Sequence, residues 1–277
     1  MGCAVKKIQA LLLSVCALLG AGVAQAQGFS ALVTPPRIEM AIKPGQDARQ
    51  VIEITQVSDQ PGRFRIYTND WQLNEQGGVQ FFDELQPGSC RPWVALERRE
   101  LTVGANAKVR FRIQVSPPAD APAKECRFAV MIEGLDTSRV NSGALNFPDS
   151  GRIGVIVYAG MDGTKASLRI VGQSVVPTLE PKDRLPLLSV KNEGTSHGRL
   201  AGLLSGVDAS GKRIDFSPNT LPILPGETRP VSLQINPDPN APKDAPMPII
   251  TYPITIKGNL EWGGRLQAFE ATFSPAK

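Results

Sequence analysis

The octapeptide KVRFRIQV, residues 108–115, alternates polar and apolar side chains at every position. Its odd-numbered positions hold Val, Phe, Ile and Val, whereas its even-numbered positions hold Lys, Arg, Arg and Gln. A period of two places all four apolar side chains on one face of an extended chain, and β-branched and aromatic residues favour strands. The octapeptide therefore predicts an antiparallel strand with one face in a core and the other in solvent.

Runs of the same kind recur along the chain of 277 residues, and its 26 glycines and 24 prolines interrupt it too often for long helices. The runs predict an all-β fold of two tandem immunoglobulin-like β-sandwiches, with the stretch GMDGTK (160–165) between them. We assign the N-terminal domain to residues 27–160, the linker to 161–165 and the C-terminal domain to 166–277. The predicted strands are 49–57, 63–71, 108–115, 126–134, 152–159, 166–176, 185–192, 199–207, 213–216, 228–235, 249–257 and 260–273.

The first 26 residues predict a cleaved signal peptide. Two lysines precede a mostly apolar segment, and an Ala-Gln-Ala triplet ends at residue 26. We therefore expect export, with two of the four cysteines, Cys90 and Cys126, retained in the mature chain. An even pair in an oxidising compartment predicts one disulfide, and two free buried thiols are the alternative.

Charge and motifs argue against several functional classes. The 30 basic and 26 acidic residues are scattered, which does not favour nucleic-acid binding. The one histidine, His197, is predicted to decorate a turn, and without a second histidine or nearby cysteines it predicts no metal site. The segment GVDASGK (206–212) is followed by Arg where a phosphate-binding loop needs Ser or Thr, so we predict a hairpin turn there. No G-x-S-x-G supplies a nucleophile, so we expect no enzyme, no cofactor and no small-molecule substrate.

The stretch GRIGVIVYAG, residues 151–160, is unusually apolar for an exported protein. Ile153, Val155 and Val157 share one face, and either this face or its complement is expected to join the core of the first domain. On the other face Gly154 leaves a gap. The strand either closes the domain and does nothing more, or it is also lent to another protein.

Longer stretches carry a resemblance to a known family. TPPRIEMAIKPGQDARQVIEI (34–54) resembles the opening strand, Pro-Gly turn and second strand of PapD-like periplasmic chaperone domains. WVALERRELTVGANAKVRFRIQVSPPADAPAKECRFAVMIEG (93–134) is similar to their continuation, with a tryptophan that opens a strand, a V-x-F-x-I-x-V strand and a P-x-D-x-P turn. LSVKNEGTSHGRLAGLL and ILPGETRPVSLQI resemble the second domain of such proteins.

The resemblance implies a periplasmic pilus assembly chaperone, which lends the last strand of its first domain to an unfinished subunit by β-augmentation. The implied partners are a pilus, fimbrial or surface-fibre subunit and an outer-membrane usher. A non-catalytic structural or adhesive module of the cell envelope is the alternative function. The residues of the implied donor strand are Ile153, Val155, Ile156 and Val157.

The resemblance also implies two basic residues that hold the terminal carboxylate of the subunit. Arg37, in PPRIEM, matches the first of them. The second is expected near the cleft end of the last strand, where residues 155–158 include no basic side chain. Arg152 is the one basic residue within that strand, so it is the candidate for the second position.

Overall fold

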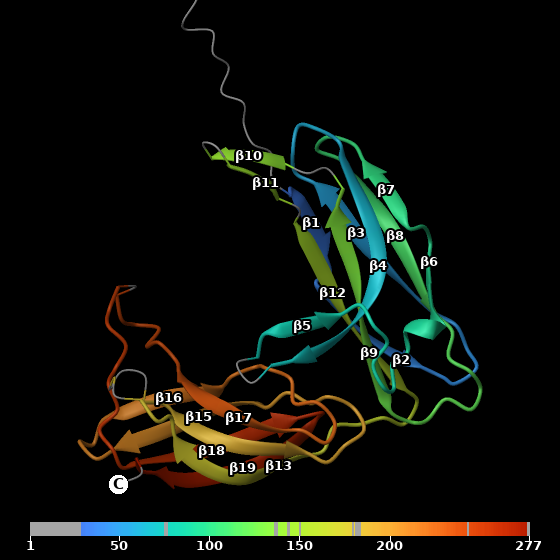
Figure 1. Ribbon diagram of the computed structural model, residues 1–277. Coiled ribbons are helices and arrows are strands. Elements are labelled where there is room, and N and C mark those ends of the chain that lie inside the picture. Colours follow the sequence, from blue (N-terminus) through green and yellow to red (C-terminus); the bar gives the residue numbers. More distant parts are fainter. Residues whose placement is uncertain are drawn as a thin grey trace, which may run out of the picture.

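Strands provide nearly all of the regular structure, and they form two all-β domains that meet at a corner (Figure 1). The computed structural model describes residues 29–74, 77–135, 138–142, 145–149, 151–178, 180, 184–242 and 244–275, so the predicted signal peptide lies outside the described residues. In the part of the chain that is described, no helix has the length and apolar character that a membrane span needs. The prediction of two all-β immunoglobulin-like domains is confirmed.

In its described residues, the first domain contains twelve strands and one short 3-10 helix. They are β1 (Ala31–Thr34), β2 (Arg37–Ile42), β3 (Ala48–Gln56), β4 (Gly62–Leu73), β5 (Val79–Phe82), η1 (Arg91–Trp93), β6 (Val94–Leu96), β7 (Glu100–Val103), β8 (Lys108–Val115), β9 (Glu125–Gly134), β10 (Ser138–Ser142), β11 (Leu145–Asp149) and β12 (Arg152–Met161). The octapeptide KVRFRIQV forms β8 with the predicted bounds.

Two sheets enclose the core of this domain. One has the order β1-β3-β8-β6, and the other has the order β2-β12-β9-β4-β5 with β7 paired to β4, while β10 and β11 form a separate hairpin. In β8, Phe111, Ile113 and Val115 are buried, as the alternation predicts. They share one hydrophobic cluster with Phe128 of β9 and Val155 of β12, from the opposite sheet.

The N-terminal part of the chain contributes to both sheets. β1 pairs with β3, whereas β2 pairs in parallel with β12 and places Arg37 beside Ile156. The crossing lies at Pro35 and Pro36, which have no N–H to continue a ladder. β2 therefore covers the edge of β12 only from Ile156 onward.

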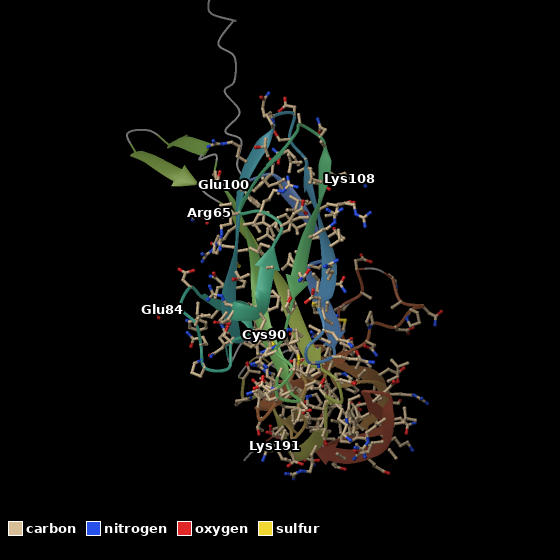
Figure 2. All side chains as sticks on the ribbon, turned by 90° about the vertical axis from the view of Figure 1, so that its right-hand side faces the viewer. Arg65, Glu84, Cys90, Glu100, Lys108 and Lys191 are labelled. Carbon is tan, nitrogen blue, oxygen red and sulfur yellow. A yellow bond between two sulfur atoms is a disulfide. The ribbon has the colours of Figure 1, made fainter. Side chains whose placement is uncertain are left out.

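The predicted disulfide is present. Cys90 and Cys126 are bonded, with their Cα atoms 5.8 Å apart and a sequence separation of 36. Cys90 immediately precedes η1, and Cys126 is the second residue of β9. The bond ties the loop before η1 to the end of the sheet that faces the second domain (Figure 2).

The second domain is a rolled seven-stranded sheet with the order β13-β14-β17-β16-β15-β18-β19. Its core includes Leu188, Phe216, Val231 and Ile256, all of them fully buried. Its strands are β13 (Leu168–Val175), β14 (Pro186–Asn192), β15 (Ala201–Asp208), β16 (Arg213–Pro218), β17 (Thr228–Ile235), β18 (Ile254–Trp262) and β19 (Arg265–Phe273).

The hairpin at the end of the chain lies elsewhere than predicted. The predicted break at residues 258–259 falls inside β18, where a Cβ on Gly258 would lie 2.7 Å from the carbonyl oxygen of Leu203. The turn is instead at Gly263 and Gly264, whose φ angles of 53° and 77° are those of a two-residue hairpin turn. Gly258 marks a close approach of two strands, and a glycine in that role resembles a turn glycine in the sequence.

The predicted turn at DASGK joins β15 to β16, and Asp208 organises it. Its Oδ1 accepts hydrogen bonds from the N–H groups of Ser210 and Lys212, both at 2.9 Å, and from the hydroxyl of Ser210 at 2.6 Å. Its Oδ2 accepts one from the N–H of Thr251 at 3.1 Å, which fixes the connection between β17 and β18. Burial opposes ionisation of Asp208, but these hydrogen bonds outweigh it and hold the pKa of its carboxyl below the ordinary value.

Asp208→Ala is expected to lower the free energy of unfolding of the second domain by about 2–4 kcal/mol, because it leaves several donors without their acceptor. Asp215→Ala, on β16 with its side chain 62% exposed, is the matched control and should change it by less than about 0.5 kcal/mol. Urea unfolding measures both. Because the folded pKa of Asp208 is depressed, its contribution is present above about pH 4 and is lost as the pH falls through the folded pKa. Equal losses in the two variants would contradict this role.

Candidate functional site

A hollow of about 710 Å³ lies where the two domains meet. Arg37 and Glu39 of β2 and Tyr158 of β12 line it, because the alternation along these strands places them on the sheet face opposite the first core. The second domain contributes His197 and Arg199, from the connection between β14 and β15. The lining of this cleft therefore depends on both domains.

His197 joins the two domains, and the prediction that it merely decorates a turn misses this role. Its Nδ1 lies 2.6 Å from Oε2 of Glu125, and its main-chain N–H donates to the same oxygen at 3.2 Å. Its Nε2 lies 3.5 Å from Oε1 of Glu39. Its ring stacks on Tyr158 with the centroids 3.8 Å apart. The N–H of Glu125 also donates to the carbonyl of Thr195 at 2.8 Å, so main chain and side chains both hold the junction.

The hairpin of β4 and β5 extends from the first domain over the second (Figure 1). Trp71 is buried on the opposite face of the sheet from the first core. Its ring meets Tyr158 edge-on at a centroid distance of 5.3 Å, and its Nε1 donates to the carbonyl of Phe128 at 3.1 Å. From the second domain, Nη1 of Arg229 donates to the carbonyl of Asn74 at 3.2 Å. The junction is thus packed as well as hydrogen-bonded.

Tyr158 and Tyr67 pack in the cluster around Trp71, whereas Tyr252 packs against the core of the second domain. Burial raises the pKa of Tyr158 to about 12 and that of Tyr252 to about 12, and it raises the pKa of Tyr67 as well. The unfolded phenol ionises near pH 10, so the folded state holds these protons more tightly. Stability should therefore be complete below about pH 10 and fall as the pH rises toward 12. Tyrosinate absorbance should show that Tyr158 and Tyr252 do not ionise near pH 10 in the folded protein, and titration of both near pH 10 without unfolding would contradict this.

Arg199 brings a second positive charge to the cleft. Its Nη1 donates to the carbonyl of Thr220 at 2.6 Å, whereas its Nε is buried and no described residue accepts a hydrogen bond from it. Burial lowers the pKa of the Arg199 guanidinium, and the nearby charge of Arg37 lowers it further. Arg37 itself pairs with Glu39 at 3.0 Å, and both side chains are half exposed. Two guanidinium groups from different domains can therefore bind one anion by charge-assisted hydrogen bonds.

Arg152, the second basic residue suggested by the resemblance, does not line this cleft. It lies directly opposite Glu133 of β9, and Glu133 lies opposite Arg65 of β4, so the three form a row across the sheet. Nη2 of Arg65 is 2.7 Å from Oε2 of Glu133. A separate hollow of about 460 Å³ contains this row and Tyr67. The structure brings Arg37 together with Arg199 and keeps Arg152 apart from both.

The side chains of the expected donor strand are largely occupied within the protein. Val155 and Val157 have 0% exposure in the first core, and Ile153 packs against the same core. Ile156 packs in the cluster around Trp71. The gap at Gly154 is filled by Phe81, since a Cβ there would lie 2.5 Å from the ring. What β12 leaves open is its main chain.

The open main chain of β12 lies between Arg152 and Val155. The N–H of Ile156 donates to the carbonyl of Pro36 at 3.1 Å, so Ile156 points to the β2 side. Main-chain groups of a strand alternate in direction, so those of Gly154 and Arg152 point to the same side. Among the described strands, none pairs with β12 there. We call this stretch the open edge, and it ends where Arg37 begins β2.

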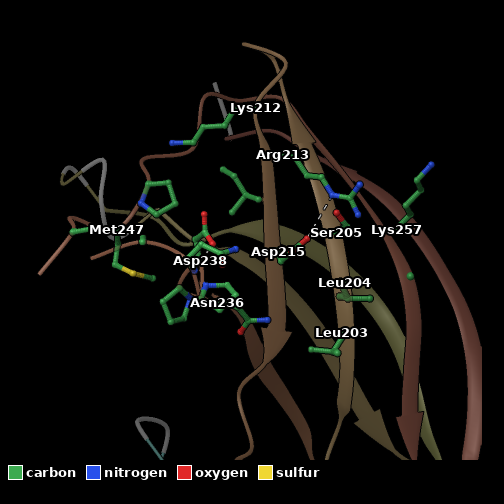
Figure 3. A pocket seen from close by; sticks show the side chains of 18 of the residues that line it. Leu203, Leu204, Ser205, Lys212, Arg213, Asp215, Asn236, Asp238, Met247 and Lys257 are labelled. Carbon is green, nitrogen blue, oxygen red and sulfur yellow. Dashed lines mark hydrogen bonds and ion pairs between the residues drawn. The ribbon is translucent and has the colours of Figure 1, made fainter. Parts of the chain in front are cut away.

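Another hollow, of about 1540 Å³, lies on the second domain. Residues 236–242 and 245–248 form one wall, with Met247, and β15 forms the other, with Leu203 and Leu204 (Figure 3). Leu203 is 79% exposed and Met247 50%. This hollow on the second domain shares no lining residue with the cleft between the domains.

Sequence reasoning named Arg37 but missed Arg199 and Tyr158 as cleft residues. A signal for Tyr158 was present, because the period of two along GRIGVIVYAG places this amphipathic side chain on the face away from the core. Arg199 offered no such signal, since its place beside Arg37 depends on how the domains meet.

The comparisons with known proteins return similar solved structures. No family model matches this sequence, and no curated protein does. The YadV chaperone is 11% identical with a TM-score of 0.47, and the match covers 88% of this chain and 100% of that one. The CupB2 chaperone of Pseudomonas aeruginosa is 9% identical with a TM-score of 0.46, over 88% and 100% of the two chains. A chain from the complex of the Salmonella enterica SafA pilin with the SafB chaperone is 15% identical with a TM-score of 0.45, over 89% and 97%.

Proposed function

We propose that this protein is a non-catalytic periplasmic chaperone, which holds the C-terminal strand of a pilus, fimbrial or surface-fibre subunit until the subunit is assembled. The open edge of β12, which ends at Arg37, is the observation that carries the proposal. The predicted signal peptide and the PapD-like sequence stretches support the periplasmic location and the class of partner. An outer-membrane usher is a further partner that the resemblance implies.

The open edge offers β-augmentation. An extended segment placed beside Arg152 and Gly154 meets N–H and C=O groups that no described strand pairs, and it adds one strand to the sheet. Each hydrogen bond of such a ladder contributes about 0.5–1.5 kcal/mol net. The edge is short, because β2 takes it over at Ile156. Main-chain pairing alone therefore gives a weak complex, and a further anchor is needed.

Arg37 and Arg199 supply that anchor. The added strand must stop where β2 begins, so its last residue lies next to Arg37 and the cleft. A free terminal carboxylate can then accept hydrogen bonds from the guanidinium groups of Arg37 and Arg199, which both line the cleft, each worth about 1.5–3 kcal/mol. The C-terminal carboxylate of the added strand lies at the cleft, and its preceding residues lie beside Arg152. The added strand must therefore run parallel to β12. Arg199 thus takes the role that the resemblance led us to expect of Arg152.

A structural module of the cell envelope is the alternative function. The contacts of His197, Glu125 and Tyr158 support it, because they hold the two domains at one angle, as a rigid spacer requires. A spacer, however, needs neither an open strand edge nor two guanidinium groups from different domains beside it.

Co-expression with candidate pilus or fibre subunits tests the proposal. A chaperone is expected to co-purify with one subunit in a 1:1 ratio. In hydrogen exchange, the amides of Arg152 and Gly154 should become protected in the complex, whereas those of β19 on the second domain should not change. Recovery of the protein alone, or a complex in which the open edge exchanges as in the free protein, would favour the structural module.

A further inference from the structure

The row across the first-domain sheet ends in a positive charge, that of Arg152, at the open edge. Arg65, Glu133 and Arg152 lie directly opposite one another on β4, β9 and β12, with charges that alternate positive, negative, positive. Each pair of directly opposite side chains shares a face of the sheet. The next position in the row, on the far side of Arg152, belongs to the strand that would be added at the open edge.

The surroundings of Arg152 are positive. The hollow that contains it is lined by four arginines, Arg65, Arg91, Arg99 and Arg152, and by two carboxylates, those of Glu133 and Asp83. Both carboxylates are already engaged. Glu133 pairs with Arg65 at 2.7 Å, and Oδ1 of Asp83 accepts a hydrogen bond from Asn69 at 2.8 Å.

Among the described residues, the exposed Arg152 has no carboxylate to itself, because Glu133 is shared with Arg65. Tyr67 forms a side-chain hydrogen bond with Arg152, and Glu133 is near enough for its charge to act on Arg152. The stronger ion pair of Glu133, however, is with Arg65 on the other side of the row. An added strand brings its side chains to within about 5 Å of Arg152, the spacing of neighbouring strands.

We propose that the partner strand bears an acidic side chain beside Arg152, which extends the alternating row to a fourth strand. The inference rests on the proposed function, because it needs a strand at the open edge. The acidic residue lies two positions before the residue beside Gly154, since the added strand runs parallel to β12 and a period of two keeps both side chains on one face. A basic residue at this position is disfavoured, because like charges directly opposite each other repel. The residue opposite Arg152 thus determines which partner strands bind well and in which register they pair.

Short synthetic peptides of alternating Val and Thr, with a free C-terminal carboxylate, test the inference on the whole protein. A single Asp, Asn or Lys is moved through the Thr positions, and affinities are measured by fluorescence anisotropy. One position should favour Asp over Asn by about fivefold and Asp over Lys by more, which corresponds to the upper range for a cross-strand ion pair. Arg152→Gln should abolish this preference, while Arg110→Gln, the same charge change at an exposed position of β8 in the other sheet, should retain it.

The outcomes separate the two proposals. In one outcome, the peptides bind with an affinity that falls when their C-terminus is amidated, while no position prefers Asp or the preference survives in Arg152→Gln. The proposal of an acidic residue beside Arg152 is then wrong, and the proposed function stands. If no peptide of any composition binds, the open edge does not receive a strand and both proposals fail.

Discussion

Arg37→Glu is expected to lower the affinity for a strand with a free C-terminal carboxylate by at least about a hundredfold. The substitution removes a charge-assisted hydrogen bond worth about 1.5–3 kcal/mol, and it places a second carboxylate where that of the partner must bind. Glu39, which now pairs with Arg37 at 3.0 Å, would also lose its partner and add to the negative charge of the cleft. The variant and the wild type can be compared by titration with the same peptide and by the yield of the 1:1 complex with a subunit.

Two controls identify the cause of such a loss. Arg110→Glu makes the same change of charge in the other sheet of the first domain and should leave the affinity unchanged. The side chain of Arg37 is 50% exposed, so its replacement should shift the free energy of unfolding by no more than about 0.5 kcal/mol. The amidated peptide should bind the wild type and Arg37→Glu with equal affinity. That result would assign the effect of Arg37 to the terminal carboxylate of the partner. Wild-type affinity of Arg37→Glu for the free carboxylate would show that the anchor lies elsewhere.

The fold could be predicted because its signals are local. Alternation in KVRFRIQV and in the other runs follows from the pleat of a single strand, and turn residues mark most of the ends. Gly258 shows the limit of such reasoning, because it serves a close contact with the carbonyl of Leu203 on a neighbouring strand. Nothing within its own strand distinguishes that purpose from a turn.

The cleft could be predicted only in part, since it depends on two domains. Arg37 could be named from the first strand alone. His197 and Arg199 acquire their roles from contacts with Glu125, Tyr158 and Arg37, all of them in the other domain. A resemblance within one strand pointed to Arg152, because a search along that strand cannot consider a cation supplied from across the junction.

Removal of the disulfide, by the double variant Cys90→Ala and Cys126→Ala, is expected to lower the free energy of unfolding of the first domain by about 4 kcal/mol. The bond closes a loop of 36 positions, and that length sets the chain entropy regained by the unfolded state. Alanine is the suitable replacement because both cysteines are buried, and serine would bury a hydroxyl. Urea unfolding without reductant, followed on the first-domain transition, measures the change.

The same variant should affect the cleft, because Cys126 directly follows Glu125 in β9. Glu125 holds His197 through its side chain at 2.6 Å and Thr195 through its N–H at 2.8 Å, so a looser start of β9 loosens the domain junction. Hydrogen exchange at the amides of Glu125 and His197 should therefore accelerate in the double variant, while β19 of the second domain exchanges as before. A loss of stability below about 1 kcal/mol, or two freely alkylated thiols in the wild type, would contradict the stabilising role of the bond. Unchanged exchange at the junction, with the stability lost as expected, would confine that role to the first domain.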